Sequence, residues 1–175
     1  MALADADQDG DLDLYVANYR TVTWKDFPPG VSARVNRVGG KPFATPSDRF
    51  VAALRPDGST NVIEIGQPDH FYLNDGSGRF RAVDWKGGQF LDEEGKPLSA
   101  IPRHWGLSVA FRDFNGDGLP DLYVCNDFLI GNDDFYLNQG GGIFRRIDQT
   151  AIAVLVRCND SVGGILGVSG STGHQ

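Results

Sequence analysis

The sequence has few of the residues on which disulfide frameworks, nitrogen- and sulfur-ligated metal sites and nucleic-acid binding depend. Its 175 residues include two cysteines, Cys125 and Cys158, and three histidines without metal-ligand spacing. Two cysteines make no disulfide framework, so a free thiol is expected for each. Lys and Arg total 16 against 23 Asp and Glu, which gives a net charge of -7. Since no basic surplus is present to neutralise phosphates, nucleic acid is excluded as an expected partner.

Long apolar runs and helical patterns are also missing. The longest apolar stretch, AIAVLV followed by GGILGV, is interrupted by Arg157 and Asp160, so no membrane insertion is expected. The opening residues, MALADADQDG, have neither a basic nor an apolar region, which predicts no signal peptide in this chain. No apolar stripe of helical period is present, so little or no helix is predicted. Glycine, by contrast, is abundant, with 23 residues, which is typical of turn-rich β structure.

The acidic residues are concentrated in two short segments. Five Asp fall in residues 5–13 and three in residues 113–121, so these segments hold eight of the 23 acids. Outside them, 15 acidic residues stand against 16 basic ones. The negative charge therefore belongs to two local features rather than to the whole surface.

Both segments open a repeated motif. DADQDGDLDLYVANY (5–19) matches DFNGDGLPDLYVCND (113–127), with Asp or Asn at motif positions 1, 3, 5 and 9 and Gly at position 6. A second motif, HFYLNDGSGRFRAVD (70–84), matches DFYLNQGGGIFRRID (134–148). Two different motifs that recur in the same order predict a duplicated structural unit.

The spacing of the motifs predicts how the units are bounded. The first unit covers 1–84 and carries a loop insertion over 20–64, because its motifs lie much further apart than those of the second unit, 85–150. Residues 151–175 lack a third acidic motif and form an atypical or truncated tail.

Local patterns predict strands and hairpins. A hairpin is predicted in the insertion, from RFVAAL, the turn RPDGST and NVIEI, and one around the Gly-rich turn of each FYLN motif. Residues 105–114 are expected to form a strand that leads into the second acidic segment. Residues 85–103 are expected to be an irregular connection with a turn at Glu94-Gly95.

The acidic segments have the spacing of calcium-binding loops. Carboxylates at alternate positions of a tight turn repel one another unless a cation lies between them. A set of oxygen ligands without Cys or His favours Ca²⁺ over zinc, and the number of protein ligands favours Ca²⁺ over Mg²⁺. About two ions are expected. The predicted ligands are Asp5, Asp7, Asp9, the carbonyl of Asp11 and Asp13 in the first loop, and Asp113, Asn115, Asp117, the carbonyl of Leu119 and Asp121 in the second. The side chain of Asp11 is expected to face solvent.

Two other interpretations of these loops compete. An EF-hand needs a Glu at position 12 and flanking helices, whereas Val16 and Val124 occupy that position and a strand pattern follows. The EF-hand is therefore excluded. Metal-free β-turns rich in Asp and Gly are the other alternative. The presence of two copies in register, each with an Asp at position 9, favours calcium.

These motifs resemble a known family. DADQDGDLDLYV and DFNGDGLPDLYV resemble the FG-GAP/VCBS repeat, and their combination with FYLN over 1–19 and 65–150 resembles bacterial relatives of the cartilage acidic protein (ASPIC/UnbV-associated) group. The resemblance implies an all-β fold: a partial β-propeller of the integrin-α type, with about two to two and a half four-stranded antiparallel blades and calcium-binding loops. It also implies that the chain is a fragment of a larger propeller.

The same resemblance implies a location and a role. Family members are usually exported, so the parent protein is expected to be extracellular, periplasmic or attached to the cell surface. A non-catalytic scaffold for binding or adhesion to an extracellular protein or carbohydrate is expected. The alternative is a fragment of a propeller-type secreted polysaccharide lyase or hydrolase. Against catalysis, His70, His104 and His174 show no triad spacing, and no serine lies in a G-x-S-x-G context.

Aromatic residues are candidates for contacts with such a partner. Trp24, Phe27 and Arg34 of the insertion, together with Trp85 and Trp105, have side chains that can stack on sugars or proteins. For Trp85 and Trp105, packing between blades is the favoured interpretation.

Overall fold

The computed structural model describes residues 1–20, 24–26, 33–127 and 133–148. All regular structure in this part of the chain is β-strand, apart from one 3-10 turn, η1 (Trp24–Asp26). The expectation of an all-β fold is thus confirmed. No helix among the described residues is long and apolar enough to cross a membrane. The predicted tail 151–175 lies outside the described residues, as does Cys158.

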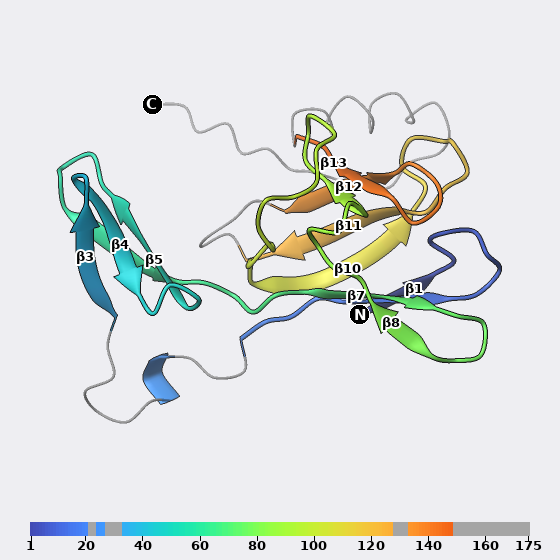
Figure 1. Ribbon diagram of the computed structural model, residues 1–175, viewed down its shortest axis with the longest axis horizontal. Helices are drawn as coiled ribbons and strands as arrows, with labels where there is room; N and C mark the ends of the chain where they lie inside the picture. The colour runs from blue at the N-terminus through green and yellow to red at the C-terminus, as the bar shows by residue number, and fades with distance from the viewer. Residues whose placement is uncertain (21–23, 27–32, 128–132, 149–175) are drawn as a thin grey trace, which may run out of the picture.

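Two antiparallel sheets, which we call blade 1 and blade 2, form the main body (Figure 1). The strands of blade 1 follow one another in chain order across the sheet: β1 (Ala2–Ala4), β2 (Asp13–Val16), β7 (His70–Asn74) and β8 (Phe80–Ala82). Blade 2 repeats this arrangement with β10 (Gly106–Arg112), β11 (Asp121–Asn126), β12 (Asp134–Asn138) and β13 (Phe144–Arg146). The predicted strand near 105–114 and both FYLN hairpins are confirmed.

The insertion forms two hairpins that lie together beside the blades in Figure 1. The predicted one pairs β5 (Phe50–Leu54) with β6 (Thr60–Glu64). The other pairs β3 (Arg34–Val38) with β4 (Lys41–Thr45) and was not predicted. Its turn is Gly39-Gly40, and both residues have positive φ angles, 56° and 79°, as a two-residue hairpin turn of this kind requires.

One short strand was missed in the segment expected to be irregular. Strand β9 (Phe90–Leu91) pairs in parallel with β13 and adds a fifth strand at the outer edge of blade 2. The turn predicted at Glu94-Gly95 is present, since the N–H of Gly95 donates to the carbonyl of Asp92 at 3.1 Å. A strand of two residues is too short to show a periodic pattern in the sequence. The side chain of Phe90 is fully buried in the core, which holds this segment beside β13.

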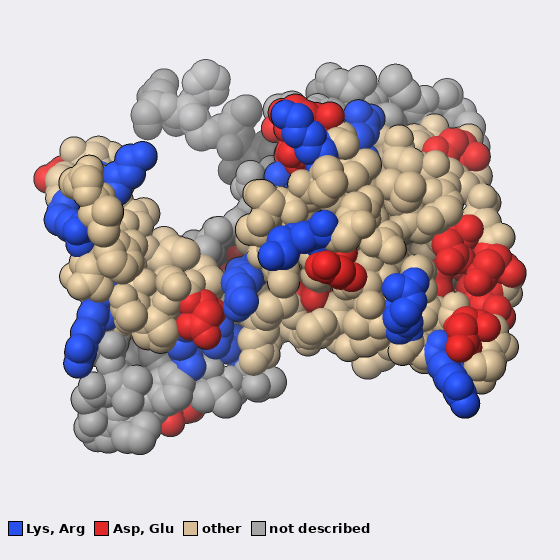
Figure 2. Space-filling view, viewed as in Figure 1, with Lys and Arg blue, Asp and Glu red and all other residues tan. Residues whose placement is uncertain are grey.

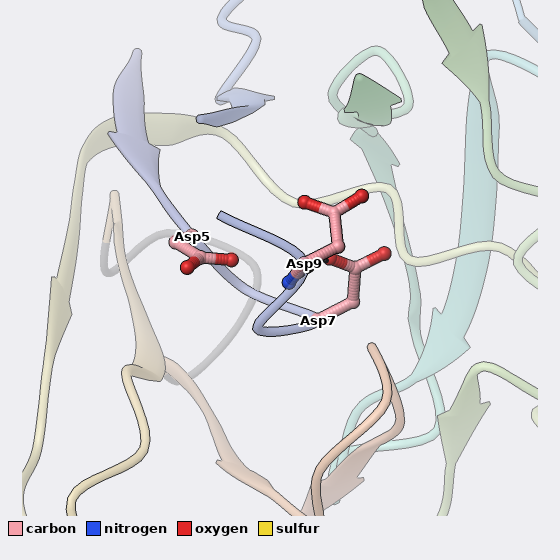
Figure 3. A group of neighbouring side chains, drawn as sticks. All are labelled: Asp5, Asp7 and Asp9. Atoms are coloured by element: carbon pink, nitrogen blue, oxygen red, sulfur yellow. Dashed lines mark hydrogen bonds between the residues drawn. The ribbon is translucent and has the colours of Figure 1, made fainter. Parts of the chain in front are cut away.

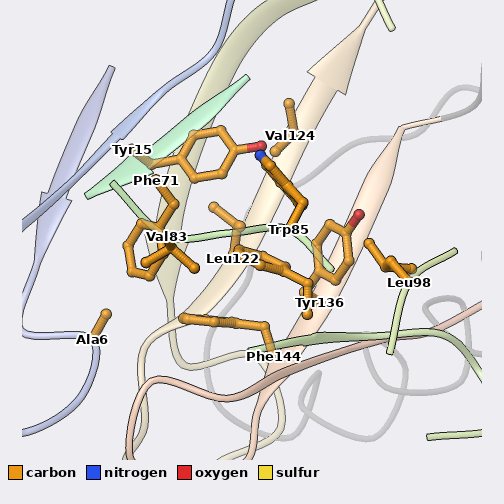
Figure 4. Packing of buried hydrophobic residues seen from close by; sticks show 11 residues of the cluster. Ala6, Tyr15, Phe71, Val83, Trp85, Leu98, Leu122, Val124, Tyr136 and Phe144 are labelled. Atoms are coloured by element: carbon orange, nitrogen blue, oxygen red, sulfur yellow. The ribbon is translucent and has the colours of Figure 1, made fainter. Parts of the chain in front are cut away.

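The hydrophobic core lies between the two blades (Figure 4). It draws on both sheets and on the segment that joins them: Ala6, Tyr15, Phe71, Val83, Trp85, Phe90, Leu98, Leu122, Val124, Tyr136 and Phe144. Trp85 is 4% exposed and its ring lies 4.1 Å from that of Phe90, so its predicted packing between the blades is confirmed. Trp105 instead stacks edge-on against Tyr19 at 4.7 Å and donates its indole N–H to the carbonyl of Glu64.

Candidate metal centre

The two acidic segments form equivalent loops. Loop 1 (5–12) joins β1 to β2, and loop 2 (113–120) joins β10 to β11, so each connects the first and second strands of its blade. Both loops lie at the same end of the blades in Figure 1, and Figure 2 shows acidic side chains gathered at this end. The duplication seen in sequence therefore places two acidic loops on one side of the molecule.

Loop 1 brings three predicted ligands together. Asp5, Asp7 and Asp9 each offer a carboxylate oxygen, and these oxygens lie within 4.8 Å of one another (Figure 3). The turn depends on positive φ angles at Gln8 (65°) and Gly10 (98°), and the N–H of Gly10 donates to Asp5 Oδ2 at 3.2 Å. The backbone thus holds the carboxylates close together despite their mutual repulsion.

No salt bridge within the described residues neutralises the carboxylates of loop 1. Asp5 Oδ1 is buried and has no hydrogen-bond partner in this part of the chain. The pKa of Asp7 is raised, first by burial and then by the charges of Asp13, Asp9 and Asp5. A buried, unpaired carboxylate oxygen beside two further carboxylates fits a hard cation, because a cation supplies the charge and coordination that the site lacks.

Loop 2 has the same backbone plan with two negative charges fewer, because Asn115 and Leu119 stand where loop 1 has Asp7 and Asp11. Asp113 accepts the N–H groups of Gly116 (2.7 Å) and Gly118 (2.9 Å). Asn115, which stands where loop 1 has Asp7, donates its amide to Asp117 Oδ2 at 2.8 Å. In loop 2 the protein itself supplies more hydrogen bonds to the carboxylates, so loop 1 fits a cation more clearly.

The Asp at position 9 of each motif connects its loop to the neighbouring strand. Asp13, fully buried, accepts the N–H of Ala6 at 2.9 Å and that of Asn74 at 2.9 Å, one on each oxygen. Asp121, also fully buried, does the same with Phe114 (2.9 Å) and Asn138 (2.8 Å). Their role as ligands stays a prediction, and each oxygen keeps a second lone pair for a cation.

The two positions expected to supply carbonyls differ in their surroundings. The expectation that the Asp11 side chain faces solvent is wrong, because this side chain is half-buried against the β7–β8 turn. Gly76 of this turn has a φ angle of 76°, which favours glycine, and a Cβ there would lie 2.5 Å from Asp11 Oδ2. Leu119 donates its N–H to Asp117 Oδ1 at 2.8 Å. The carbonyl ligand roles of both residues stay predictions.

A second pair of equivalent carboxylates lies at the opposite end of the blades and was missed from the sequence. Asp69 accepts the hydroxyl of Tyr15 at 2.9 Å and the N–H of Asn18 at 2.7 Å. Asp133 makes the same two contacts with Tyr123 and Asn126. The signal was present, because an Asp stands two residues before Phe in both FYLN motifs.

His104, which shows no triad spacing in the sequence, forms an ion pair with Asp134. Its Nδ1 lies 2.5 Å from Asp134 Oδ2, and this hydrogen bond raises the pKa of His104. The pair lines a surface cavity of about 230 Å³ together with Glu93 and Arg146. The two residues are 30 positions apart, so no local motif marks them.

The geometry defines a class: an all-β repeat protein whose blade-like sheets are duplicated, each with an acidic loop between its first two strands. The family model described as FG-GAP-like repeat matches residues 57–124 and 113–165, which together span more than half of the 175 residues. The chain therefore belongs to the FG-GAP-like repeat family, and its fold is a partial β-propeller-like array. The searches of curated proteins and of solved structures gave no match.

Proposed function

We propose that this chain is a calcium-binding repeat module with two sites, one in each acidic loop. The observation that carries the proposal is the group formed by Asp5, Asp7 and Asp9, in which Asp5 Oδ1 is buried without a hydrogen-bond partner among the described residues. The spacing of the loop and its all-oxygen donor set support Ca²⁺ as the ion.

The residues that would hold the ions follow from the motif and the loop geometry. In loop 1 they are Asp5, Asp7, Asp9, the carbonyl of Asp11 and Asp13; in loop 2 they are Asp113, Asn115, Asp117, the carbonyl of Leu119 and Asp121. Calcium, when bound, supplies positive charge that offsets the repulsion among the carboxylates. The backbone N–H groups that Asp13 and Asp121 accept fix each loop to its blade, so they orient the site before any ion arrives.

Loop 1 also lies against blade 2, which gives calcium a structural role. The carbonyl of Ala6 accepts a hydrogen bond from Asn138 at 2.8 Å. A Cβ on Gly142, in the β12–β13 turn, would lie 3.2 Å from the Cβ of Asp7. An ion that fixes loop 1 would therefore also stabilise the contact between the blades.

We further propose a non-catalytic scaffold role in binding an extracellular protein or carbohydrate. The resemblance to bacterial relatives of the cartilage acidic protein group supports this role and an extracellular, periplasmic or cell-surface location. It also supports a place for this chain within a larger propeller.

Thermal unfolding with calcium, with magnesium and with a chelator tests the calcium proposal. At a calcium concentration about a hundred times the dissociation constant, binding at each site should raise the free energy of unfolding of the protein by about 2.7 kcal/mol. This corresponds to a rise in Tm of roughly 5–10 °C for a domain of this size.

The variant Asp5→Asn should remove the part of the rise in Tm that is due to loop 1. Asp57→Asn is the matched control, because Asp57 is an exposed turn carboxylate in the insertion hairpin. Equal calcium effects on both variants, or no calcium effect on the folded wild type, would refute the proposal.

A further inference from the structure

A groove lies on blade 2, between β13 and the segment that leads into β10. It consists of two cavities, of about 360 and 230 Å³, which share Glu93, His104 and Arg146 in their walls. We call the two together the His104 groove. The larger cavity has a volume within the range of small-molecule sites. The groove lies away from the acidic loops, because Asp134, which lines it, begins β12, whereas Asn138, which contacts loop 2, ends that strand.

Two ion pairs hold hydrogen-bond donors in place along this groove. His104 Nδ1 bonds to Asp134, so Nε2 of the protonated ring keeps a donor that has no partner among the described residues. Arg146 donates through Nε and Nη2 to the two carboxylate oxygens of Glu93, at 2.9 and 3.2 Å, which leaves Nη1 unused in this part of the chain. Because each cation is held by a carboxylate, the remaining donors are oriented before a ligand arrives.

The wall opposite these pairs combines backbone polar groups with apolar surface. Residues 99–101 line the larger cavity, and their backbone makes no hydrogen bond with another described residue. Beside them lie Leu98, which is buried, and Ile101 and Pro102, which are half-buried. This wall therefore suits a ligand that has both hydroxyl groups and C–H groups.

The charges around the groove favour a neutral ligand. The larger cavity is lined by three acidic and three basic residues, namely Asp92, Glu93, Glu94, Arg103, His104 and Arg146. The smaller cavity adds three acidic residues, Asp133, Asp134 and Asp148. This excess of acids disfavours an anion, whereas the unused donors of His104 and Arg146 disfavour a cation. A neutral ligand leaves both ion pairs intact and buries no unpaired charge.

We propose that the His104 groove binds a neutral pyranose ring of a carbohydrate. Sugar hydroxyls can accept from His104 Nε2 and Arg146 Nη1 and can donate to backbone carbonyls of residues 99–101, while the C–H groups of the ring pack against Ile101 and Pro102. An extended peptide would need a regular strand to pair with, and residues 99–105 form none. This inference rests on the proposed carbohydrate-binding role and adds its site and its ligand class.

Saturation-transfer NMR and shift titrations of the full chain test the site with defined sugars. The neutral probes are the methyl glycosides of glucose, galactose, mannose and N-acetylglucosamine, and the charged probes are glucuronate and glucosamine. At least one neutral probe should bind with a dissociation constant of about 1 mM, since a single ring has few atoms. Both charged probes should bind at least about ten-fold more weakly.

Two variants locate the binding. Glu93→Gln loosens the side chain of Arg146 and should raise the dissociation constant about ten-fold, and His104→Asn, which lacks the Nε2 donor, should do the same. The Glu93 side chain is 41% exposed, so its replacement should leave the fold intact, as circular dichroism can establish. Asp57→Asn is the matched control, because it removes one negative charge at an exposed turn of the insertion, and it should bind like the wild type.

The outcomes separate this inference from the calcium proposal. If no neutral probe binds, if glucuronate or glucosamine binds as well as the best neutral probe, or if both groove variants bind like the control, the inference is overturned. The rise in Tm with calcium should be the same in Glu93→Gln and in the wild type, because the groove and the acidic loops lie apart. A protein that binds the neutral probe through the groove but shows no calcium effect would support the inference and refute the calcium sites.

Discussion

The side-chain amide of Asn138 donates a hydrogen bond to the carbonyl of Ala6 at 2.8 Å, across 132 positions of sequence. Asn138 ends β12 of blade 2, whereas Ala6 lies in loop 1 of blade 1. The same side-chain amide donates to the carbonyl of Pro120 in loop 2 at 3.2 Å, so one asparagine contacts both acidic loops. The two candidate metal loops are therefore physically connected.

Replacing Asn138 with alanine should destabilise the fold. The residue is 1% exposed, so its loss leaves the carbonyl of Ala6 buried without this donor, at a cost of about 2 kcal/mol in the free energy of unfolding. Asn74→Ala is the matched control, because Asn74 occupies the equivalent place in blade 1, but its side-chain amide donates within its own blade, to the exposed carbonyl of Leu12 at 3.3 Å. Its cost should stay below about 1 kcal/mol. Urea denaturation measures both, and equal losses would contradict the interblade role.

Asp13→Asn should destabilise the protein even in the absence of calcium. Both oxygens of Asp13 accept backbone N–H groups in a fully buried place, and an amide would turn its own donor towards one of them. The expected loss is about 2–3 kcal/mol, measured by denaturation in excess chelator. Asp9→Asn, at an exposed position of the same loop, should change the chelated protein by less than about 0.5 kcal/mol. If Asp9→Asn lowers the free energy of unfolding as much as Asp13→Asn does, the two backbone hydrogen bonds of Asp13 do not stabilise the fold.

The ion pair between His104 and Asp134 predicts a pH dependence of stability. Because the pKa of His104 is raised in the folded protein, its contribution is complete below the ordinary histidine pKa of about 6.5. It is lost as the pH rises through the raised value. The loss should be about 1–2 kcal/mol, since the hydrogen bond is charged and partly buried. His104→Asn should abolish this slope, whereas His70→Asn, at an exposed position, should keep it. If the free energy of unfolding of the wild type does not change over the pH range in which His104 loses its proton, the pair is not charged.

Much of the fold was predictable from short-range patterns. The FYLN motifs with their Gly-rich turns predicted β7–β8 and β12–β13, because hairpin register depends mainly on the turn and on alternation. The β3–β4 hairpin was missed although Gly39-Gly40 offered the turn signal. Every residue of β3 is exposed, and in β4 only Ala44 is buried, so the two strands show no shared apolar alternation. Strand β9 was missed because only tertiary pairing with β13 defines it.

The residues that form the candidate site could be predicted from the sequence, but the hydrogen bonds between them and the rest of the fold could not. The spacing of Asp5, Asp7 and Asp9 predicted that their carboxylates converge, as they do. That Asp13 accepts the N–H of Asn74 could not be predicted, because the contact joins residues 61 positions apart and depends on how β2 and β7 pair. The His104 and Asp134 pair was hidden for the same reason.

Calorimetric titration of the folded chain with Ca²⁺ tests the central claim most directly. Two binding sites should be observed, and the double variant Asp9→Ala with Asp117→Ala should lose both, because each change removes a predicted ligand from one loop. A folded sample, established by circular dichroism, that gives no binding heat at millimolar Ca²⁺ would contradict the assignment of the acidic loops as calcium sites.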